Sequence, residues 1–533
     1  MVCSKRAPPF KAARRWKNWN GCVSTRGKQL RRGAWQCALF WARQKSSKGV
    51  PPHAPTDQVF AASHFSRETK MKRVLYTLAL LLFTMLCSRK QAAAQEVRQI
   101  KPKPSTEVVG DWKVRVSGGA IRVTQIGEKM KTRFALLKTP VTLDVAPAEI
   151  VSVKDEAYDA LPLFNADTAG WTKGAQLRGV VAMEVTAPDY LDPNSVVVKN
   201  APNGEVFTRG TDYEMDAQWA TIGRLPNGKI GDNTKVFISY RHGLGRLDSI
   251  VANLEGKVSI RKGEAKINLP HPPNLDRNET RLANIWVFGR MTKLTGDNLF
   301  PISQGEYSQA VTPSQNIEKL LPKTLAKLRR GAPLKILAWG DSVTDGGYLP
   351  ESERWQHQFV ARLQQRFPQA KIELLTQGWG GRTTQAFLDE PPGSEHNYRE
   401  RVLAVRPDLV ISEFVNDAYL SPEQVETLYS GVLKDFNEIG AEWMIQTPHY
   451  VAPSWMALTR EKNIDDDPRP YVTGVKAFAA KHNVALSDAS RHWGQLYQQG
   501  IPYTTLLGNM VNHPDARGIK LFADALMELF PQR

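Results

Sequence analysis

The sequence predicts an all-β, sandwich-like domain followed by a three-layer α/β/α domain, and two observations predict this order. From about residue 97 to 312, short runs of β-branched residues such as "TKVFISYRH" are separated by Gly, Pro, Asn and Asp. That texture is typical of a β-sandwich. After about residue 313, near-continuous apolar runs alternate with amphipathic segments, which favours a parallel sheet with helices on both faces. We expect domains at 95–312 and 313–533.

The individual elements follow from these patterns. In the first domain, strands are expected within residues 111–126, 175–188, 195–200, 234–242 and 256–270. In the second, buried strands are expected at 334–340, 371–375, 408–414, 441–448 and 484–488. A capping box, in which Ser421 precedes Pro422 and Gln424, predicts a helix over 421–440. Further helices are expected at 471–483 and 516–530, the last of which buries Ile519, Phe522, Leu526 and Leu529.

The net charge of +18 is concentrated at the N-terminus. Residues 1–70 hold 15 Lys and Arg against two acids, and residues 71–94 add four basic residues and no acid. The chain after residue 94 is therefore nearly neutral, which argues against a nucleic-acid partner.

Residues 71–94 have the layout of a secretory signal peptide. "MKR" precedes an apolar run of 14 residues, and "AAAQ" offers a cleavage site near Ala94. The run is shorter than the roughly 20 residues of a membrane-spanning helix. We therefore expect a secreted or periplasmic protein that starts near Gln95 and has no membrane partner after cleavage, with residues 1–70 a mis-called N-terminal extension. The alternative is a basic arm before a signal anchor.

All four cysteines lie at or before Cys87, so no disulfide is expected in the exported chain. No HExxH motif or cysteine cluster occurs, and neither a metal nor a cofactor is expected. The sequence does not predict an oligomeric state.

Four short stretches carry the candidate chemistry. "GDS" places Ser342 directly after a predicted buried strand, where doubly wound sheets bind ligands. "GWGGRTT" follows the next strand and contains Gly381, "EFVND" ends another strand at Asn416, and "NHPD" opens the last helix with His513. Each stretch alone also fits a turn or a helix start.

In this order, the four stretches resemble those of the SGNH (GDSL-type) serine hydrolase family, over residues 332–533. The resemblance implies an SGNH-like, flavodoxin-like fold, with Ser342 as nucleophile and His513 as general base. It also implies an oxyanion hole made by the N–H groups of Ser342 and Gly381 and the side chain of Asn416.

The chain departs from the family pattern at two informative positions. Phe414 replaces a glycine, which would narrow the pocket beside Asn416. Met510 stands where an aspartate is expected three residues before His513, and methionine cannot orient an imidazole. We favour a Ser–His dyad oriented by a main-chain carbonyl, and Asn509, Asp488 or a carboxylate from another loop stays open as the partner.

Three other residues are candidate substrate contacts: Trp379 and Arg382 beside the oxyanion loop, and His449 after a predicted strand. The leading interpretation is a secreted serine esterase that hydrolyses short acyl esters, O-acetyl groups above all, on a polysaccharide or oligosaccharide. The alternatives are an O-acetyltransferase that uses the same serine, and a glycan-binding protein with an inactive hydrolase domain.

Overall fold

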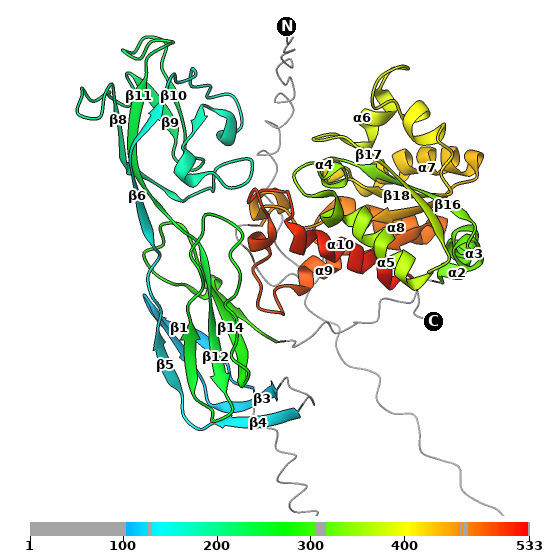
Figure 1. Ribbon diagram of the computed structural model, residues 1–533, viewed down its shortest axis with the longest axis horizontal. Coiled ribbons are helices and arrows are strands. Elements are labelled where there is room, and N and C mark those ends of the chain that lie inside the picture. Colours follow the sequence, from blue (N-terminus) through cyan, green and yellow to red (C-terminus); the bar gives the residue numbers. More distant parts are fainter. Residues whose placement is uncertain (1–102, 126–130, 304–315, 459–460, 462–466, 531–533) are drawn as a thin grey trace, which may run out of the picture. The chain divides into compact units, whose positions relative to one another are not determined.

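The computed structural model describes residues 103–125, 131–303, 316–458, 461 and 467–530 (Figure 1). The predicted signal peptide, the segment 1–70 and the predicted boundary near residue 312 lie outside these residues. Within the described residues, no helix combines the length and the apolar character that crossing a membrane requires. Two regions are distinguished below: a β region, 103–303, and an α/β region, 316–530.

Among the described residues of the β region, every ladder between two strands is antiparallel, as in the β-sandwich class that the sequence predicts. One set of strands forms the sheets β1-β2-β5, β3-β4 and β13-β12-β14-β15. Val114, Ile250 and Ile285 belong to the single apolar core that these sheets share. The strands are β1 (Thr106–Gly110), β2 (Lys113–Val116), β3 (Gly119–Gln125), β4 (Lys131–Leu137), β5 (Val141–Asp144), β12 (Arg246–Asn253), β13 (Val258–Arg261), β14 (Glu279–Val287) and β15 (Leu299–Pro301).

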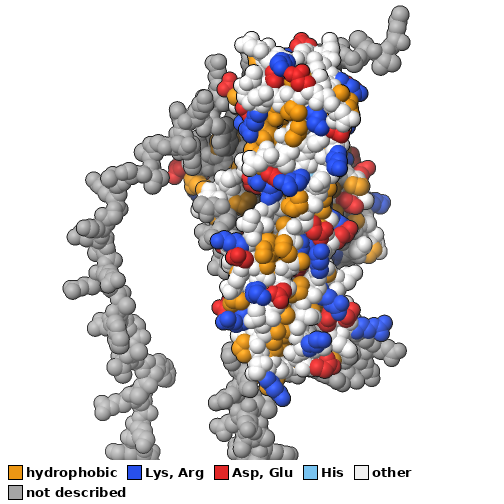
Figure 2. Space-filling model, turned by 90° about the vertical axis from the view of Figure 1, so that its left-hand side faces the viewer, with side chains coloured by type: hydrophobic (Ala, Val, Ile, Leu, Met, Phe, Trp, Pro, Cys, Tyr) orange, Lys and Arg blue, Asp and Glu red, His pale blue; other side chains and the backbone are white. Residues whose placement is uncertain are grey.

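A second β core lies between β5 and β12 in the chain, where the sequence predicted a single sandwich. Its sheets, β6-β11-β8 and β7-β10-β9, pack around Val198, Ile222 and Ile238. The strands are β6 (Ile150–Tyr158), β7 (Ala175–Gln176), β8 (Leu191–Lys199), β9 (Tyr213–Asp216), β10 (Thr221–Arg224) and β11 (Val236–Gly243). On the face seen in Figure 2, basic and acidic side chains are interspersed, as the near-neutral composition after residue 94 leads one to expect.

The α/β region is built on a five-stranded parallel sheet of order β17-β16-β18-β19-β20. Its strands are β16 (Pro333–Gly340), β17 (Lys371–Gly378), β18 (Leu409–Glu413), β19 (Glu442–Gln446) and β20 (Ala485–Ser487). This is a doubly wound order in which the chain first adds a strand on one side of β16 and then adds the rest on the other. The predicted α/β/α fold class is confirmed.

Helices cover both faces of this sheet, because alternate residues of each strand point to opposite faces. Ile336 and Ala338 pack with α3, α5, α9 and α10, whereas Leu337 and Trp339 pack with α6, α7 and α8 (Figure 1). The helices are α2 (Ile317–Leu320), α3 (Pro322–Arg330), α4 (Ser342–Asp345), α5 (Trp355–Arg366), α6 (Thr384–Asp389), α7 (Pro422–Ile439), α8 (Pro470–His482), α9 (Ala489–Gln495) and α10 (Ala516–Glu528).

Helix α7 begins with the capping box that the sequence predicted. The Ser421 hydroxyl accepts from the main-chain N–H of Gln424, and the Gln424 side chain accepts from the N–H of Ser421. The apolar face of α7 is buried at Val425, Val432 and Phe436. Pro422 occupies the first turn, where its missing N–H costs nothing.

We expect Ser421→Ala to lower the free energy of unfolding by about 1 kcal/mol, because the main-chain N–H of Gln424 loses the Ser421 hydroxyl that accepts from it. Urea-induced unfolding followed by circular dichroism measures the change. Ser430→Ala, in the middle of the same helix, is the matched control and should be neutral or slightly stabilising, since Ala favours helix interiors. Equal destabilisation by the two substitutions would contradict the role of the cap.

Candidate active site

Ser342 lies at the carboxyl end of β16, the strand at which the order of the sheet reverses. It is the first residue of α4, and the preceding Asp341 caps that helix by accepting from the N–H of Val343 at 3.1 Å. Gly340 is required in this turn, because a Cβ there would lie 2.2 Å from the Glu413 carbonyl oxygen. The loops after β17 and β18 necessarily flank Ser342, since these strands are the two neighbours of β16.

His513 is brought to Ser342 from the loop before α10. Its Nε2 lies 2.9 Å from the Ser342 Oγ, although 171 residues separate the two in the chain. The ring of Tyr348 stacks on the imidazole, with centroids 4.5 Å apart and an interplanar angle of 2°. The sequence analysis paired Ser342 with His513 but gave no role to Tyr348, which follows α4 in "GGYLP".

The side chain of Asn509 organises the loop that carries His513. Its Oδ1 accepts from the main-chain N–H groups of Val511, Asn512 and His513 at 2.9–3.0 Å. Asn509 was one candidate for orienting the imidazole, but its contact is with the main chain of His513 and not with the ring. It therefore sets the position of the loop.

His449 supports the same loop from inside the protein. Its side chain is fully buried, and its Nε2 lies 2.7 Å from the carbonyl oxygen of Asn512. Burial also holds the pKa of His449 well below its ordinary value, so the imidazole is neutral and donates to that carbonyl. The prediction that His449 contacts substrate is therefore wrong: the side chain turns inward from the strand end.

The Nδ1 of His513 faces a carboxylate of the β region, that of Glu184. The sequence analysis favoured a main-chain carbonyl here, and the structure corrects it. Glu184 also accepts from the Asn509 Nδ2 at 3.2 Å. Its hydrogen bond with His513 holds the pKa of Glu184 below its ordinary value, against the opposing effect of partial burial.

Glu184 comes from a stretch that the sequence analysis assigned to a strand. Only Ala175–Gln176 of residues 175–188 is a strand; Arg178–Val180 forms a 3₁₀ turn, and the N–H of Ala182 then donates to the Val185 carbonyl at 2.8 Å. These turns place Glu184 at a bend, where its side chain is 41% exposed.

Asp488, the rival carboxylate, does not contact His513. It caps α9, accepts from Thr447 and Ser490 at 3.1 and 2.9 Å, and pairs with Lys476 at 3.0 Å. All these partners belong to the packing of β20 and α9 against the rest of the α/β region. Asp488 is thus a structural residue.

Two glycines and an asparagine border Ser342 as oxyanion candidates. A Cβ on Gly380 would lie 3.8 Å from that of Ser342, and Gly381 has a positive φ of 71° with open space around it. The main-chain N–H and the Nδ2 of Asn416 both donate to Asp341, at 2.9 and 3.0 Å. A primary amide carries a second N–H, so Asn416 keeps a donor for a substrate oxygen.

Buried carboxyl groups fix the positions of these donors. Burial raises the pKa of Asp341 to about 6, opposed by hydrogen bonds from Asn416 and Val343. Asp417 accepts from the N–H of Thr384 at 3.0 Å and thereby ties the loop after β17 to the turn after β18. Burial raises the pKa of Asp417 to about 7.

The predicted contacts Trp379 and Arg382 lie beside the glycines. The Arg382 guanidinium sits 4.7 Å above the Trp379 ring, which also stacks with the ring of His396 at 4.3 Å and meets Phe387 edge-on at 5.5 Å. Phe414, expected to narrow the pocket, is instead buried and packs edge-on against Trp339 at 5.0 Å. It belongs to the core.

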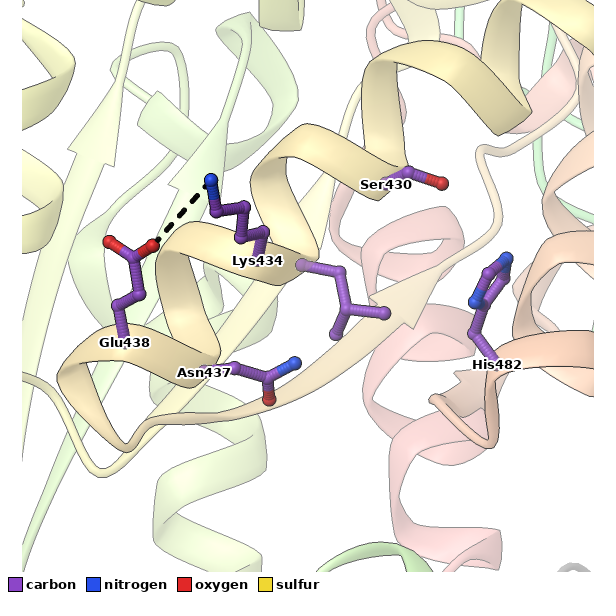
Figure 3. Close-up of a pocket in the computed structure, with 6 residues that line it drawn as sticks. Ser430, Lys434, Asn437, Glu438 and His482 are labelled. Atoms are coloured by element: carbon purple, nitrogen blue, oxygen red, sulfur yellow. Dashed lines mark ion pairs between the residues drawn. The ribbon is translucent and has the colours of Figure 1, made fainter.

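A separate hollow of about 460 Å³ lies between α7 and the end of α8 (Figure 3). All its lining residues except His482 lie between the middle and the end of α7, which runs away from the carboxyl ends of the strands, so the hollow is not part of the Ser342 site. Its lining includes Lys434 and Glu438, paired at 3.9 Å, and His482. Within the described residues, no group of three or more His, Cys, Asp and Glu side chains has the arrangement of a metal site.

The chain is similar to one protein family and to several solved structures. Residues 338–521 match the family model described as GDSL-like Lipase/Acylhydrolase family. No curated protein matches the sequence.

Solved structures similar to the chain include an α/β-hydrolase enzyme from the metagenome of Lake Arreo, Spain (20% identity, TM-score 0.30, covering 36% of this chain and 93% of that one). Another is the acetylxylan esterase Axe2 from Geobacillus stearothermophilus (19%, 0.30, 37% and 94%). A third is a two-domain esterase active on acetylated mannans, co-crystallised with mannopentaose (20%, 0.33); this chain covers 54% of it, with 40% of its own residues.

We expect Asn509→Ala to lower kcat/KM for an aryl acetate by roughly 10²-fold, because small displacements of a catalytic group cost about that much. Steady-state kinetics on the purified protein measures the loss. Asp488→Asn is the comparison variant and should retain activity within a few fold, since Asp488 contacts neither His513 nor Ser342. A large loss in Asp488→Asn with an intact fold would show that the site depends on a different acid.

Proposed function

Because residues 338–521 match the model of the GDSL-like lipase/acylhydrolase family, we propose that this protein is an exported serine esterase that removes short acyl groups, above all O-acetyl groups, from a polysaccharide. The observation that carries the proposal is the 2.9 Å contact between the Ser342 Oγ and the His513 Nε2 at the reversal point of the sheet. Export rests on the signal-like sequence of residues 71–94, and the domain division is proposed as 95–312 and 313–533.

The geometry supports acyl transfer in two steps. The His513 Nε2 takes the proton of Ser342 while the Oγ attacks the ester carbonyl carbon. The same nitrogen then gives that proton to the oxygen of the leaving alcohol, and Ser342 is left acylated. A water molecule repeats the sequence, with His513 as base, and releases the carboxylic acid and free serine.

The developing oxyanion would be stabilised by donors that are fixed before substrate arrives. We assign this role to the N–H of Ser342, the N–H of Gly381 and the second N–H of Asn416. By analogy with other oxyanion holes, one such donor is worth about 3–4 kcal/mol of the barrier. Gly380 lies beside the nucleophile, because a Cβ there would make van der Waals contact with the Ser342 Cβ at 3.8 Å, whereas nothing lies within 4 Å of a Cβ built at Gly381.

Three tryptophans support a polysaccharide as the substrate. Trp455, from the loop after β19, is 51% exposed and lies 6.0 Å from Trp171 of the β region, ring centre to ring centre. Trp171 in turn packs edge-on against Trp219 at 4.9 Å. Exposed aromatic faces that gather in one place commonly mark binding surfaces, and the C–H groups of sugar rings pack well on them.

This tryptophan cluster (Trp171, Trp219 and Trp455) is anchored to the segments that carry the site. The N–H of Ala452, in the loop of Trp455, donates to the carbonyl of Val511 at 2.6 Å, two residues before His513. On the other side, Thr186 lies two residues after Glu184 in the chain, and its hydroxyl donates to the carbonyl of Trp219. The cluster is therefore tied to the segments that carry His513 and Glu184.

Two other functions lead to different products. An O-acetyltransferase would move the acetyl group from Ser342 to a sugar hydroxyl and not to water. A glycan-binding protein with an inactive hydrolase domain would release nothing, but the close approach of Ser342 to His513 favours an active site. Acetate release from acetylated xylan, with and without an acceptor sugar, distinguishes these functions.

We expect Ser342→Ala and His513→Ala to abolish hydrolysis of aryl acetate to a similar extent, because nucleophile and base act as a unit. The assay is a panel of aryl acetate, butyrate and octanoate esters with residues 95–533, in which acetate should be preferred. Unchanged melting temperatures would show that the fold survives. Full activity in Ser342→Ala would end the esterase proposal.

Trp455→Ala should raise KM for an acetylated polysaccharide by about tenfold while leaving kcat/KM for aryl acetate nearly unchanged. The small ester makes no use of the tryptophan cluster, whereas the polymer loses a stacking surface. Tyr419→Ala, which removes another exposed aromatic ring, is the matched control. Equal effects of Trp455→Ala on both substrates would argue against a role in glycan binding.

A further inference from the structure

We propose that Glu184 of the β region is the positioning carboxylate of His513, so that the β region is part of the catalytic machinery of the α/β region. The inference rests on the proposed function and adds to it the residue that orients the base. The β region, which the sequence predicts as a separate domain, then takes part in catalysis by orienting the base.

The two contacts of the imidazole fix its tautomer. With its Nδ1–H group donating a hydrogen bond to the Glu184 carboxylate, the imidazole keeps a lone pair on Nε2 that faces the Ser342 hydroxyl. Only this tautomer can accept the proton of the nucleophile. When Nε2 is protonated in the reaction, the adjacent carboxylate stabilises the imidazolium that results.

The loop of His513 has no acid of its own for this task. Met510, three residues before His513, has a positive φ of 57° and packs against the apolar core of the β region that contains Val198 and Ile238. The position that the resemblance assigns to an acid therefore serves as an apolar anchor on the β region. The carboxylate that meets the imidazole arrives from the same region.

Further contacts hold the loop and Glu184 in register. The Nδ2 of Asn268, in the β region, donates to the carbonyl of Gly508 at 2.8 Å, and a Cβ at Gly508 would lie 3.0 Å from the Met183 sulfur. Asn509 donates to Glu184 itself at 3.2 Å. The β region thus contacts the loop of His513 at residues 508, 509, 510 and 513. These contacts help to hold the Glu184 carboxylate beside the imidazole.

Four groups surround the imidazole and bear on its charge. Glu184 faces Nδ1, Tyr348 covers one ring face, and the buried Asp341 and His449 interact with His513 electrostatically. Tyr348 and His449 are uncharged at neutral pH, because burial raises the pKa of the Tyr348 hydroxyl and lowers the pKa of the His449 imidazole. Glu184, whose pKa is lowered, stays ionised throughout the range in which an esterase of this kind is assayed.

The test is the pH dependence of kcat/KM for aryl acetate in the full chain and in its Glu184→Ala, Glu184→Gln and Glu184→Asp variants. We expect Glu184→Ala to lower kcat/KM by roughly 10⁴-fold, the size of loss seen when the acid of a triad is removed. Glu184→Gln should move the acidic limb of the profile to lower pH, because the imidazolium loses a neighbouring negative charge. Glu184→Asp should recover part of the activity.

Glu205→Ala is the matched control, since Glu205 is an exposed acid of the same β region that pairs with Lys229 at 2.6 Å. It should leave both activity and pH profile unchanged. Full activity in Glu184→Ala, with Ser342→Ala inactive, would overturn the inference and leave the esterase intact. An equal loss in all three Glu184 variants with an unmoved pH profile would reduce Glu184 to a structural residue. A wild-type chain that hydrolyses no ester would overturn both proposals.

Discussion

The contact between the Glu184 carboxylate and the Nδ1 of His513 is the constraint on which the site depends. It joins residues 329 positions apart and brings a turn of the β region against the loop before α10. The nucleophile and the candidate oxyanion donors can be traced to the parallel sheet alone. The base requires the β region as well, both for the orientation of its imidazole and for the anchoring of its loop through Met510 and Gly508.

The sheet supplies the rest by topology. The reversal of strand order at β16 leaves a crevice at its carboxyl end, and Ser342, Gly381 and Asn416 follow three adjacent strands into it. The carboxylates of Asp341 and Asp417 accept hydrogen bonds that link these turns to one another. Both carboxyl groups are buried, and burial raises their pKa values. This arrangement holds the donors still before substrate binds, which is the condition for electrostatic catalysis.

Much of the fold was predictable because its signals are local. Continuous apolar runs identified the buried strands, and the capping box at Ser421 located the start of α7. The pairing of Ser342 with His513 followed from motif order. Glu184 was not predictable in this way, since it is one of 53 acids and lies in "VVAMEVT", whose apolar residues indicate a strand. Met510 showed that an acid was missing from the loop, but only the tertiary structure shows where the replacement comes from. The prediction that His449 contacts substrate was wrong for a related reason, since a polar residue after a strand can turn inward and bind a main-chain carbonyl.

In the proposed mechanism, Ser342 is a nucleophile activated by His513. Mass-spectrometric mapping of the wild-type chain after reaction with a serine-directed phosphonate tests this role. We expect one adduct per chain, on the peptide that contains Ser342. A chain that takes up no label, or takes it up at another residue while Ser342 stays unmodified, would contradict it.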